Sequence, residues 1–240
     1  MSRRRRNTTK IEIVQVAMRR FLENGFSNTS AKSICDELEI STGNMTFYFP
    51  TKEHLLAVLV EMLCKFQWKM MERLTDEGAS SLLAMCLELP TIAATCEENE
   101  IIKDFYLASY SHTMTLDIIR HTDVEKAHAI FGEYCPDWEE ENFIEAEVLV
   151  SGIEYATLMT TSDSAPLDVR VAGALNSILM IYNVPEELRK AKVEKVLAMD
   201  YRSIGRRILQ EFKDYVNQLD DEDIDELLIP LQERNKKGTE

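Results

Sequence analysis

The sequence is poor in the residues that form turns. Glycine (8) and proline (6) together reach about half of the roughly 12% of positions that average usage gives them. This supply is too small for the many tight turns of a β-sandwich or a barrel. Hydrophobic residues make up 45% of the 240 positions, which argues against disorder. We therefore expect an all-α protein with a substantial core.

Long hydrophobic runs are also missing. No unbroken apolar run exceeds six residues, as in Leu55–Val60, whereas a membrane span needs roughly 20. No apolar segment follows the basic run Arg3–Arg6, so the pattern does not predict a secretory signal. These absences predict a soluble, cytoplasmic protein that does not associate with membranes.

The motifs of common enzymes and metal sites are absent. The five cysteines include no C-x-x-C pair, so they do not fit a disulfide framework or a zinc site. The sequence contains no G-x-S-x-G, no glycine-rich phosphate loop and no H-E-x-x-H. We expect neither enzymatic activity nor a cofactor, and we interpret the cysteines as small buried hydrophobes.

The charge is acidic and unevenly distributed. A net charge of −15 argues on its own against a nucleic-acid-binding protein. Residues 1–55, however, carry nine Lys/Arg and six Asp/Glu, a balance of +3, and the remaining residues carry −18. This asymmetry suggests that a small basic head meets a polyanion while an acidic body repels it. The alternative is that Arg3–Arg6 serve only to keep the chain in solution.

Helix signals divide the head, residues 1–51, into three short helices. Thr9 and Glu12 have the spacing of a capping box, and Gly25 suits the residue after a helix C-terminus. Thr29 or Ser30 caps a second helix. Ser41 caps a third helix, whose inner face carries two apolar residues four positions apart, Met45 and Phe49.

The second and third helices, joined by the turn Glu39–Ser41, match the helix-turn-helix motif. In this motif the second helix enters the major groove of DNA with small or polar residues outward. Thr42, Gly43 and Thr46 suit that role. The alternative is an ordinary three-helix unit with a polar face.

Residues at fixed spacing in this region resemble the tetracycline-repressor (TetR/AcrR) family over about 45 positions. They are Gly25-Phe26, Thr29-Ser30, Ile34, Ile40-Ser41, Gly43-Asn44-Met45, Tyr48-Phe49, Thr51-Lys52-Glu53 and Leu55. The resemblance implies a helix-turn-helix domain on a larger helical ligand-binding and dimerisation domain. It also implies repression that ends when a small molecule releases the protein from its operator.

When the DNA-contacting positions of the family are transferred to this sequence, the resemblance implies seven residues that contact DNA. They are Thr29, Thr42, Gly43, Thr46, Phe47, Tyr48 and Lys52. Of these, Thr29, Tyr48 and Lys52 correspond to positions that hold phosphates. Glu39 stands where the family often has a turn glycine.

The rest of the chain is expected to be a helical body, residues 52–219, followed by an acidic C-terminal tail, residues 220–240. A long helix is expected from Lys52 to about Asp76, and we expect it to transmit movement between the head and the body. Further on, Thr122 and Glu125 have capping-box spacing and predict the start of a helix near Val124.

Two apolar stripes are candidates for the seam of a homodimer, in which paired helices would form a four-helix bundle. They comprise Phe143, Ala146, Val150, Ile153 and Leu158, and Val171, Ala174, Leu175, Ile178 and Ile181. The alternative is that both stripes belong to the monomer core. A twofold dimer would place two recognition helices in successive major grooves of a pseudo-palindromic double-stranded DNA operator.

Aromatic and flexible apolar residues in the body predict a pocket for a small, mostly apolar effector. The residues expected to contact ligand are Phe105, Tyr106, Tyr110, Met114, Tyr155 and Met159. Plain core packing is the alternative. A metal site is not predicted, although Asp117, His121, Glu125 and His128 recur at helical spacing.

The sequence therefore predicts a DNA-binding transcriptional regulator, a repressor that a small, mostly apolar effector releases from its operator. Two other hypotheses remain open at this point. The body of the regulator could sense a partner protein or a metal, or the chain could be a helical small-molecule enzyme with an incidental basic head.

Overall fold

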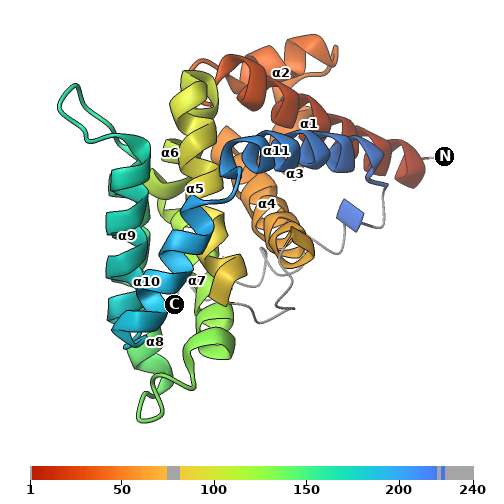
Figure 1. Cartoon of the computed structure of the whole chain (residues 1–240). Coiled ribbons are helices and arrows are strands. Elements are labelled where there is room, and N and C mark those ends of the chain that lie inside the picture. Colours follow the sequence, from red (N-terminus) through yellow and green to blue (C-terminus); the bar gives the residue numbers. More distant parts are fainter. Residues whose placement is uncertain (1, 75–81, 221–222, 225–240) are drawn as a thin grey trace.

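The computed structural model describes residues 2–74, 82–220 and 223–224. In these residues the chain forms eleven α-helices and no strand, which confirms the expected fold class (Figure 1). The helices of the head are α1 (Ser2–Asn24), α2 (Ala31–Glu37) and α3 (Thr42–Tyr48). The body contains α4 (Lys52–Leu74), α5 (Leu82–Glu98), α6 (Glu100–Ser111), α7 (Thr113–Phe131), α8 (Glu140–Leu158), α9 (Leu167–Ile181), α10 (Glu186–Leu197) and α11 (Tyr201–Gln218).

Capping residues define the short helices of the head. The Ser30 hydroxyl accepts a hydrogen bond from the backbone N–H of Ser33, and the Ser41 hydroxyl accepts one from Asn44. Each bond satisfies a donor that the first turn of a helix leaves without a partner. After α1, Gly25 adopts a φ of +89°, a backbone conformation that glycine reaches without strain. These termini lie where the sequence predicts them.

The start of α1 was predicted wrongly. The helix begins at Ser2 rather than after Thr9, so the basic run Arg3–Arg6 belongs to the helix. Arginine has high helix propensity, so four consecutive arginines extend the helix beyond the capping pattern at Thr9. The acidic tail from residue 220 onward lies almost wholly outside the described residues.

A second difference concerns residues 100–134. The sequence predicts a helix over 100–120 and another from Val124, whereas the structure breaks the chain at His112 and continues α7 to Phe131. Thr122 and Glu125 therefore lie inside a helix. Close to the observed break, the Ser111 hydroxyl donates to the carbonyls of Leu107 and Ala108, a side-chain bond that competes with helix continuation.

Helix α5 lies at the centre of the body. Its residues from Leu82 to Cys96 are buried except Glu88, and it contacts α4, α6, α8, α9, α10 and α11 (Figure 1). Helix α11 crosses it at Gly205, where an added Cβ would lie 2.5 Å from the carbonyl oxygen of Thr91. Only glycine permits the two backbones to approach so closely.

The head contacts the body directly and is not connected to it through α4 alone. Helix α1 contacts α6 and α11, and Figure 1 shows α11 running beside α1. The Gln15 amide on α1 donates to the backbone carbonyl of Val216 on α11, at 3.3 Å. The loop after α1 is bound to α6 through Ser27 and Asp104.

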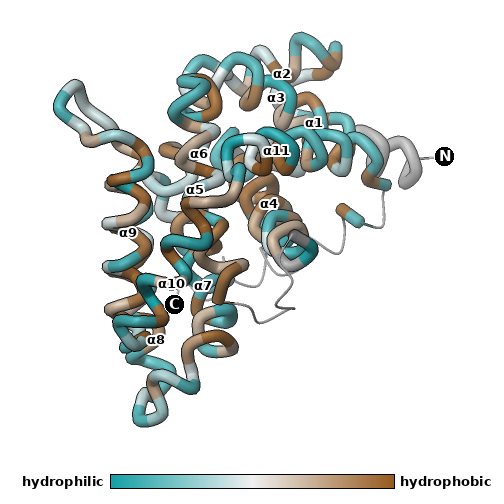
Figure 2. The backbone as a smooth tube through the Cα atoms, in the orientation of Figure 1, coloured by the Kyte–Doolittle hydropathy of each residue, from teal (hydrophilic) through white to brown (hydrophobic). Residues whose placement is uncertain are grey.

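Helices α8 and α9 pack side by side at one edge of the molecule, where α9 shows hydrophobic segments along its length (Figure 2). Most of the residues expected in the dimer seam point inward: Phe143, Ala146, Val150 and Leu158 of α8, and Val171, Ala174, Leu175 and Ile178 of α9, are buried in the monomer. Ile153 and Ile181 are half-buried against the same core. The alternative interpretation, monomer core, therefore holds for these stripes.

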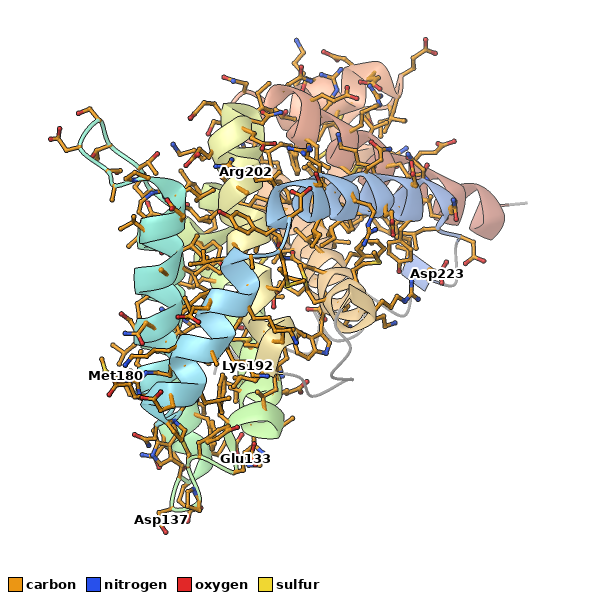
Figure 3. The ribbon with its side chains drawn as sticks, in the orientation of Figure 1. Glu133, Asp137, Met180, Lys192, Arg202 and Asp223 are labelled. Carbon is orange, nitrogen blue, oxygen red and sulfur yellow. The ribbon has the colours of Figure 1, made fainter. Side chains whose placement is uncertain are left out.

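The outward side of the same two helices is nevertheless apolar. Met180 lies there at the edge of the molecule (Figure 3), with 56% of its surface exposed. The other exposed apolar residues are Ile144, Val148, Leu149 and Met159, with Val169 on α9. None of the described helices combines the length and the apolar character that a membrane span needs.

Candidate nucleic-acid interface and ligand cavity

Helix α3 is held by the two residues that the sequence predicts on its inner face. Met45 and Phe49 are fully buried, and the Met45 sulfur lies 3.7 Å from the thiol of Cys35 on α2. Because these anchors occupy one side of a helix of seven residues, the other side of α3 faces solvent.

The open side of α3 carries the residues expected to meet DNA. Thr42, Gly43 and Thr46 are exposed, and Tyr48 is half-buried. Phe47 is 69% exposed, the highest exposure among the large hydrophobic residues, and its ring contacts that of Tyr48 edge-on at 5.1 Å. An exposed phenylalanine is costly in water, but it suits apolar contact with a thymine methyl in the major groove.

Two of the seven expected DNA contacts face inward instead. Thr29 is 2% exposed, and its hydroxyl donates to the carbonyl of Gly25 at 2.8 Å; Ser30 is the residue that caps α2. The Lys52 ammonium donates to the carbonyls of Phe26 and Thr29, at 2.9 and 3.0 Å, and lies over the Phe26 ring. These polar groups are used to close the turn after α1, so neither residue presents them to a phosphate in this structure.

Several cations of the head are paired. Arg19 and Arg20 on α1 both form ion pairs with Glu37 on α2, which neutralises part of their charge. Lys32 on α2 is exposed. The basic character of the head therefore depends strongly on the run Arg3–Arg6, whose backbone is helical.

The body contains a small cavity of about 30 Å³ lined by residues of α4, α5, α6, α7 and α8. Its wall is partly apolar, but it also includes polar and acidic side chains. The lining residues are Val60, Leu63, Cys64, Gln67, Glu88, Ile92, Tyr106, Ser109, Tyr110, Ile119, Asp123 and Glu154.

The acidic residues of this cavity form a partly buried network. The Lys126 ammonium lies 2.9 Å from the Asp123 carboxylate and 3.5 Å from that of Glu88. Burial lowers the pKa of Lys126, but the charges of Asp123 and Glu88 outweigh burial and raise it, so the lysine stays charged. The Tyr110 hydroxyl donates to Glu154 at 3.0 Å.

Burial also affects the acids. It raises the pKa of Glu154 well above the ordinary value, and the charges of Asp123, Glu147 and Glu88 add to the effect. Burial likewise raises the pKa of Glu147 to about 8. The Glu147 carboxyl also accepts a hydrogen bond from the Tyr182 hydroxyl. Both carboxyl groups therefore hold a proton more strongly than an exposed glutamate does.

Of the six residues expected to bind ligand, the structure places two in the cavity wall, Tyr106 and Tyr110. Phe105 is buried behind Tyr106, and Met114 and Tyr155 are half-buried without lining the cavity. Met159 is 48% exposed on the outward side of the body. The predicted group is therefore spread over core, cavity and surface.

Sequence reasoning missed the acids of the cavity, because it considered the acidic residues of the body only through their net charge. A signal was present in α8, where Glu147 and Glu154 lie seven residues apart in an apolar stretch. Residues seven apart share a helix face, so one acid on the buried face implies that the other is near it.

The His and acidic residues of α7 lie on one continuous helix, contrary to the helix break that the sequence suggests. Asp117, His121, Glu125 and His128 are exposed, and the His121 ring nitrogen lies 3.9 Å from the Glu125 carboxylate. Across the described ranges, no group of three or more His, Cys, Asp and Glu side chains is placed to hold a metal ion.

Comparison with known proteins identifies the head. Residues 13–59 match the family model described as "Bacterial regulatory proteins, tetR family". The match spans α1 from Ile13, the whole of α2 and α3, and the first part of α4. The head of the chain is therefore similar to the N-terminal helix-turn-helix domain of these bacterial regulatory proteins.

Two solved structures are similar to the chain as a whole. One is a gamma-butyrolactone receptor (ArpA-like protein), with 16% identity, a TM-score of 0.43, and coverage of 86% of this chain and 99% of that chain. The other is the TetR family protein CprB from S. coelicolor A3(2), with 17% identity, a TM-score of 0.41 and the same coverage. No curated protein matches the sequence.

Proposed function

We propose that the protein is a homodimeric transcriptional repressor that binds a pseudo-palindromic operator through α3 and leaves it when a small effector enters the body cavity. The observation that carries this proposal is that α4 belongs to both sites. Its first residue, Lys52, is hydrogen-bonded into the head, and four residues further along line the cavity. A ligand that displaces α4 therefore displaces the head.

Helix α6 provides a second connection. Asp104 binds the loop after α1, and Tyr106, Ser109 and Tyr110 of the same helix line the cavity. A helix of 12 residues moves as a rigid rod over this distance, so a shift at Tyr106 reaches Asp104. Two separate helices thus convert a change in the cavity into a change in the position of α3.

The outward side of α8 and α9 is the proposed dimer interface. It carries the exposed apolar residues Ile144, Val148 and Leu149 beside Val169 and Met180. Gly152 and Gly173 on the same helices have open space where a Cβ would lie, which permits close approach of a second copy. Pairing this face with itself by a twofold axis gives a four-helix interface and two copies of α3.

Release from DNA then follows as a population shift. The operator favours the spacing of the two heads that matches successive major grooves, and the effector favours another. A coupling free energy of roughly 1–3 kcal/mol changes operator affinity about 5–150-fold. The protein works by binding rather than catalysis, and it works in the cytoplasm, where the bacterial chromosome lies.

Operator binding is tested by fluorescence anisotropy with the full chain. One labelled duplex comes from the region upstream of the protein's own gene, and a scrambled duplex of equal composition is the control. We expect saturable binding to the first duplex, with affinity about a thousandfold above that for the scrambled one. Equal binding to both duplexes at every salt concentration would contradict the proposal.

A variant separates the role of α3 from that of the fold. A Cβ at Gly43 would have only the Ser41 hydroxyl near it, at 3.9 Å, so Gly43→Ala should unfold at the temperature of the unmodified chain. On DNA, the added methyl group lies on the open side of α3. We expect Gly43→Ala to lose operator affinity while its thermal unfolding is unchanged.

A further inference from the structure

The cavity of the body carries more negative than positive charge. Three carboxyl groups line it, those of Glu88, Asp123 and Glu154, and none of the described lining residues is a lysine or an arginine. Lys126 pairs with two of the three acids, Asp123 and Glu88. One ammonium group cannot balance three carboxylates, so a cation would stabilise the ionised form of the third, Glu154.

The pKa of Glu154 agrees with this balance. Burial, with the charges of Asp123, Glu147 and Glu88, raises its pKa well above the ordinary value, against the hydrogen bond that Tyr110 donates. Glu154 therefore holds a proton more strongly than an exposed glutamate does, and a cation beside it favours the ionised form. A positively charged ligand takes the place of that proton, which leaves to solvent.

An unpartnered amide points into the same cavity. Gln67 is only 3% exposed and lines the wall, yet its side chain has no hydrogen-bond partner among the residues that the structure describes. A buried amide without a partner costs free energy, and native proteins rarely tolerate one. Its carbonyl oxygen is available to a ligand that carries N–H donors.

The remaining wall is suited to a small apolar body. Val60, Leu63, Ile92 and Ile119 supply aliphatic surface, and Tyr106 and Tyr110 supply rings. The enclosed volume of about 30 Å³ holds a water molecule or two. Anything larger must push the lining apart, and α4 contributes Val60, Leu63, Cys64 and Gln67 to it.

We infer that the effector is a small organic cation: a short apolar body that carries one protonated amine, whose N–H groups donate to Glu154, Asp123 and the amide oxygen of Gln67. The inference rests on the proposed function, because it takes the cavity to be the effector site. It replaces an effector defined only as apolar with one defined by its charge. A carboxylate of the same size is repelled, and an alcohol leaves the acidic network without a counter-charge.

The test compares three molecules that differ only in their polar group: n-hexylamine, 1-hexanol and hexanoate. A linear chain is chosen because it displaces few side chains. Binding to the full-length protein is measured by isothermal titration calorimetry without DNA. We expect the affinity of the amine to be at least about ten times that of the alcohol, because the amine forms a charge-assisted hydrogen bond. Hexanoate should not bind. Equal affinity of amine and alcohol, or no binding of the amine at millimolar concentration, would overturn the inference.

Two variants assign the effect to the cavity. Glu154→Gln keeps an acceptor for Tyr110 but cannot become negative, so the amine should lose its advantage over the alcohol. Gln67→Met removes the unpartnered amide, so the protein should be at least as stable to heat while the amine binds more weakly. Glu194→Gln, an exposed acid on α10, is the matched control and should behave like the unmodified chain. Loss of amine binding in Glu194→Gln, or its full retention in Glu154→Gln, refutes the assignment.

Proton release supplies an independent readout. Because Glu154 must ionise to pair with the amine, the affinity of the unmodified chain should rise as the pH is raised, and Glu154→Gln should abolish the rise. The titratable groups that face Glu154 are Tyr110 of α6, Glu88 of α5, Asp123 of α7, Glu147 of α8 and Tyr182 after α9. An affinity that is independent of pH in the unmodified chain contradicts the inference.

The DNA titration separates this inference from the proposed function. If the protein binds its operator specifically but not the amine, the inference fails and the regulator stands. If the amine binds with the expected preference while no duplex is bound specifically, the cavity assignment stands and the regulator fails. If both bind, hexylammonium should lower operator affinity in the unmodified chain and not in Glu154→Gln.

Discussion

The Asp104 carboxylate on α6 accepts two hydrogen bonds from Ser27 in the loop after α1, one from the backbone N–H at 2.8 Å and one from the hydroxyl. Beside them, the Phe26 ring contacts His112 edge-on at 5.2 Å. The head is therefore fixed to α6 in addition to its covalent connection into α4 and its contact with α11. This contact links the position of α3 to the helix that carries Tyr106 and Tyr110.

Asp104→Ala should release the head from α6. We expect faster amide hydrogen exchange in residues 25–30 and a loss of about 1–2 kcal/mol in the free energy of unfolding, because two hydrogen bonds to a charged acceptor disappear. The effector response of DNA binding should weaken as well. Asp137→Ala, at an exposed loop position, is the control. Unchanged exchange in residues 25–30 would contradict a bound head.

Two threonines of the head should behave in opposite ways. Thr46 is exposed on α3, so Thr46→Ala should leave unfolding unchanged but alter the ratio of affinities for the operator and a variant duplex by about tenfold. Thr29 is buried and hydrogen-bonded to Gly25, so Thr29→Val should lower the unfolding temperature. Equal losses on both duplexes for Thr46→Ala would show that it reads no base.

Lys52 should act on stability rather than on phosphate binding. Its ammonium is already occupied by the carbonyls of Phe26 and Thr29, so Lys52→Met should cost about 1–3 kcal/mol of unfolding free energy. The slope of log affinity against log salt should stay the same, because no phosphate contact is lost. A slope reduced by about one unit would show that Lys52 turns to the DNA backbone instead.

The outward face of α8 and α9 should determine the oligomeric state. Leu149→Glu combined with Met180→Glu places charge on two exposed apolar positions, and we expect a monomer in analytical ultracentrifugation with weaker operator binding. Ile101→Glu changes an exposed apolar residue on α6, outside this face, and should leave the dimer intact. A double variant that sediments like the unmodified chain would exclude this face.

Stability should fall as the pH rises toward 8. Burial raises the pKa of Glu147 to about 8, so between the unfolded carboxyl value and 8 the folded state holds a proton that the unfolded state has lost. The buried and charged groups around it are Tyr182, Asp123, Lys126, Glu88 and Glu154. Glu147→Gln should reduce the difference in unfolding free energy between acidic and alkaline conditions by on the order of 2 kcal/mol, measured by denaturant titration. An unchanged pH dependence would show that Glu147 is already ionised.

The sequence predicts well those parts of the fold that local chemistry determines. Ser30 and Ser41 cap their helices, and Met45 anchors α3, because capping and apolar spacing act within a few residues. Glu39 adopts a φ of +54°, which explains why the family often has a glycine at that position.

The parts that local sequence patterns do not determine depend on distant contacts. Thr29 and Lys52 were assigned to DNA by position, but their partners lie in the loop after α1, which a motif match does not reveal. Phe143 and Val171 lie on apolar stripes that a dimer and a monomer core explain equally well before packing is known. The position of Glu154 in the cavity wall depends on five helices that meet there. Within its own helix, the only signal is its spacing of seven residues from Glu147.

The contact of Gln15 with Val216 has a consequence for biosynthesis. The ribosome makes Gln15 201 positions before Val216, so α1 is synthesised long before α11, which contacts it from the side. A nascent chain can form α2 and α3 early, but its head reaches the final seat only after residue 218 has left the exit tunnel.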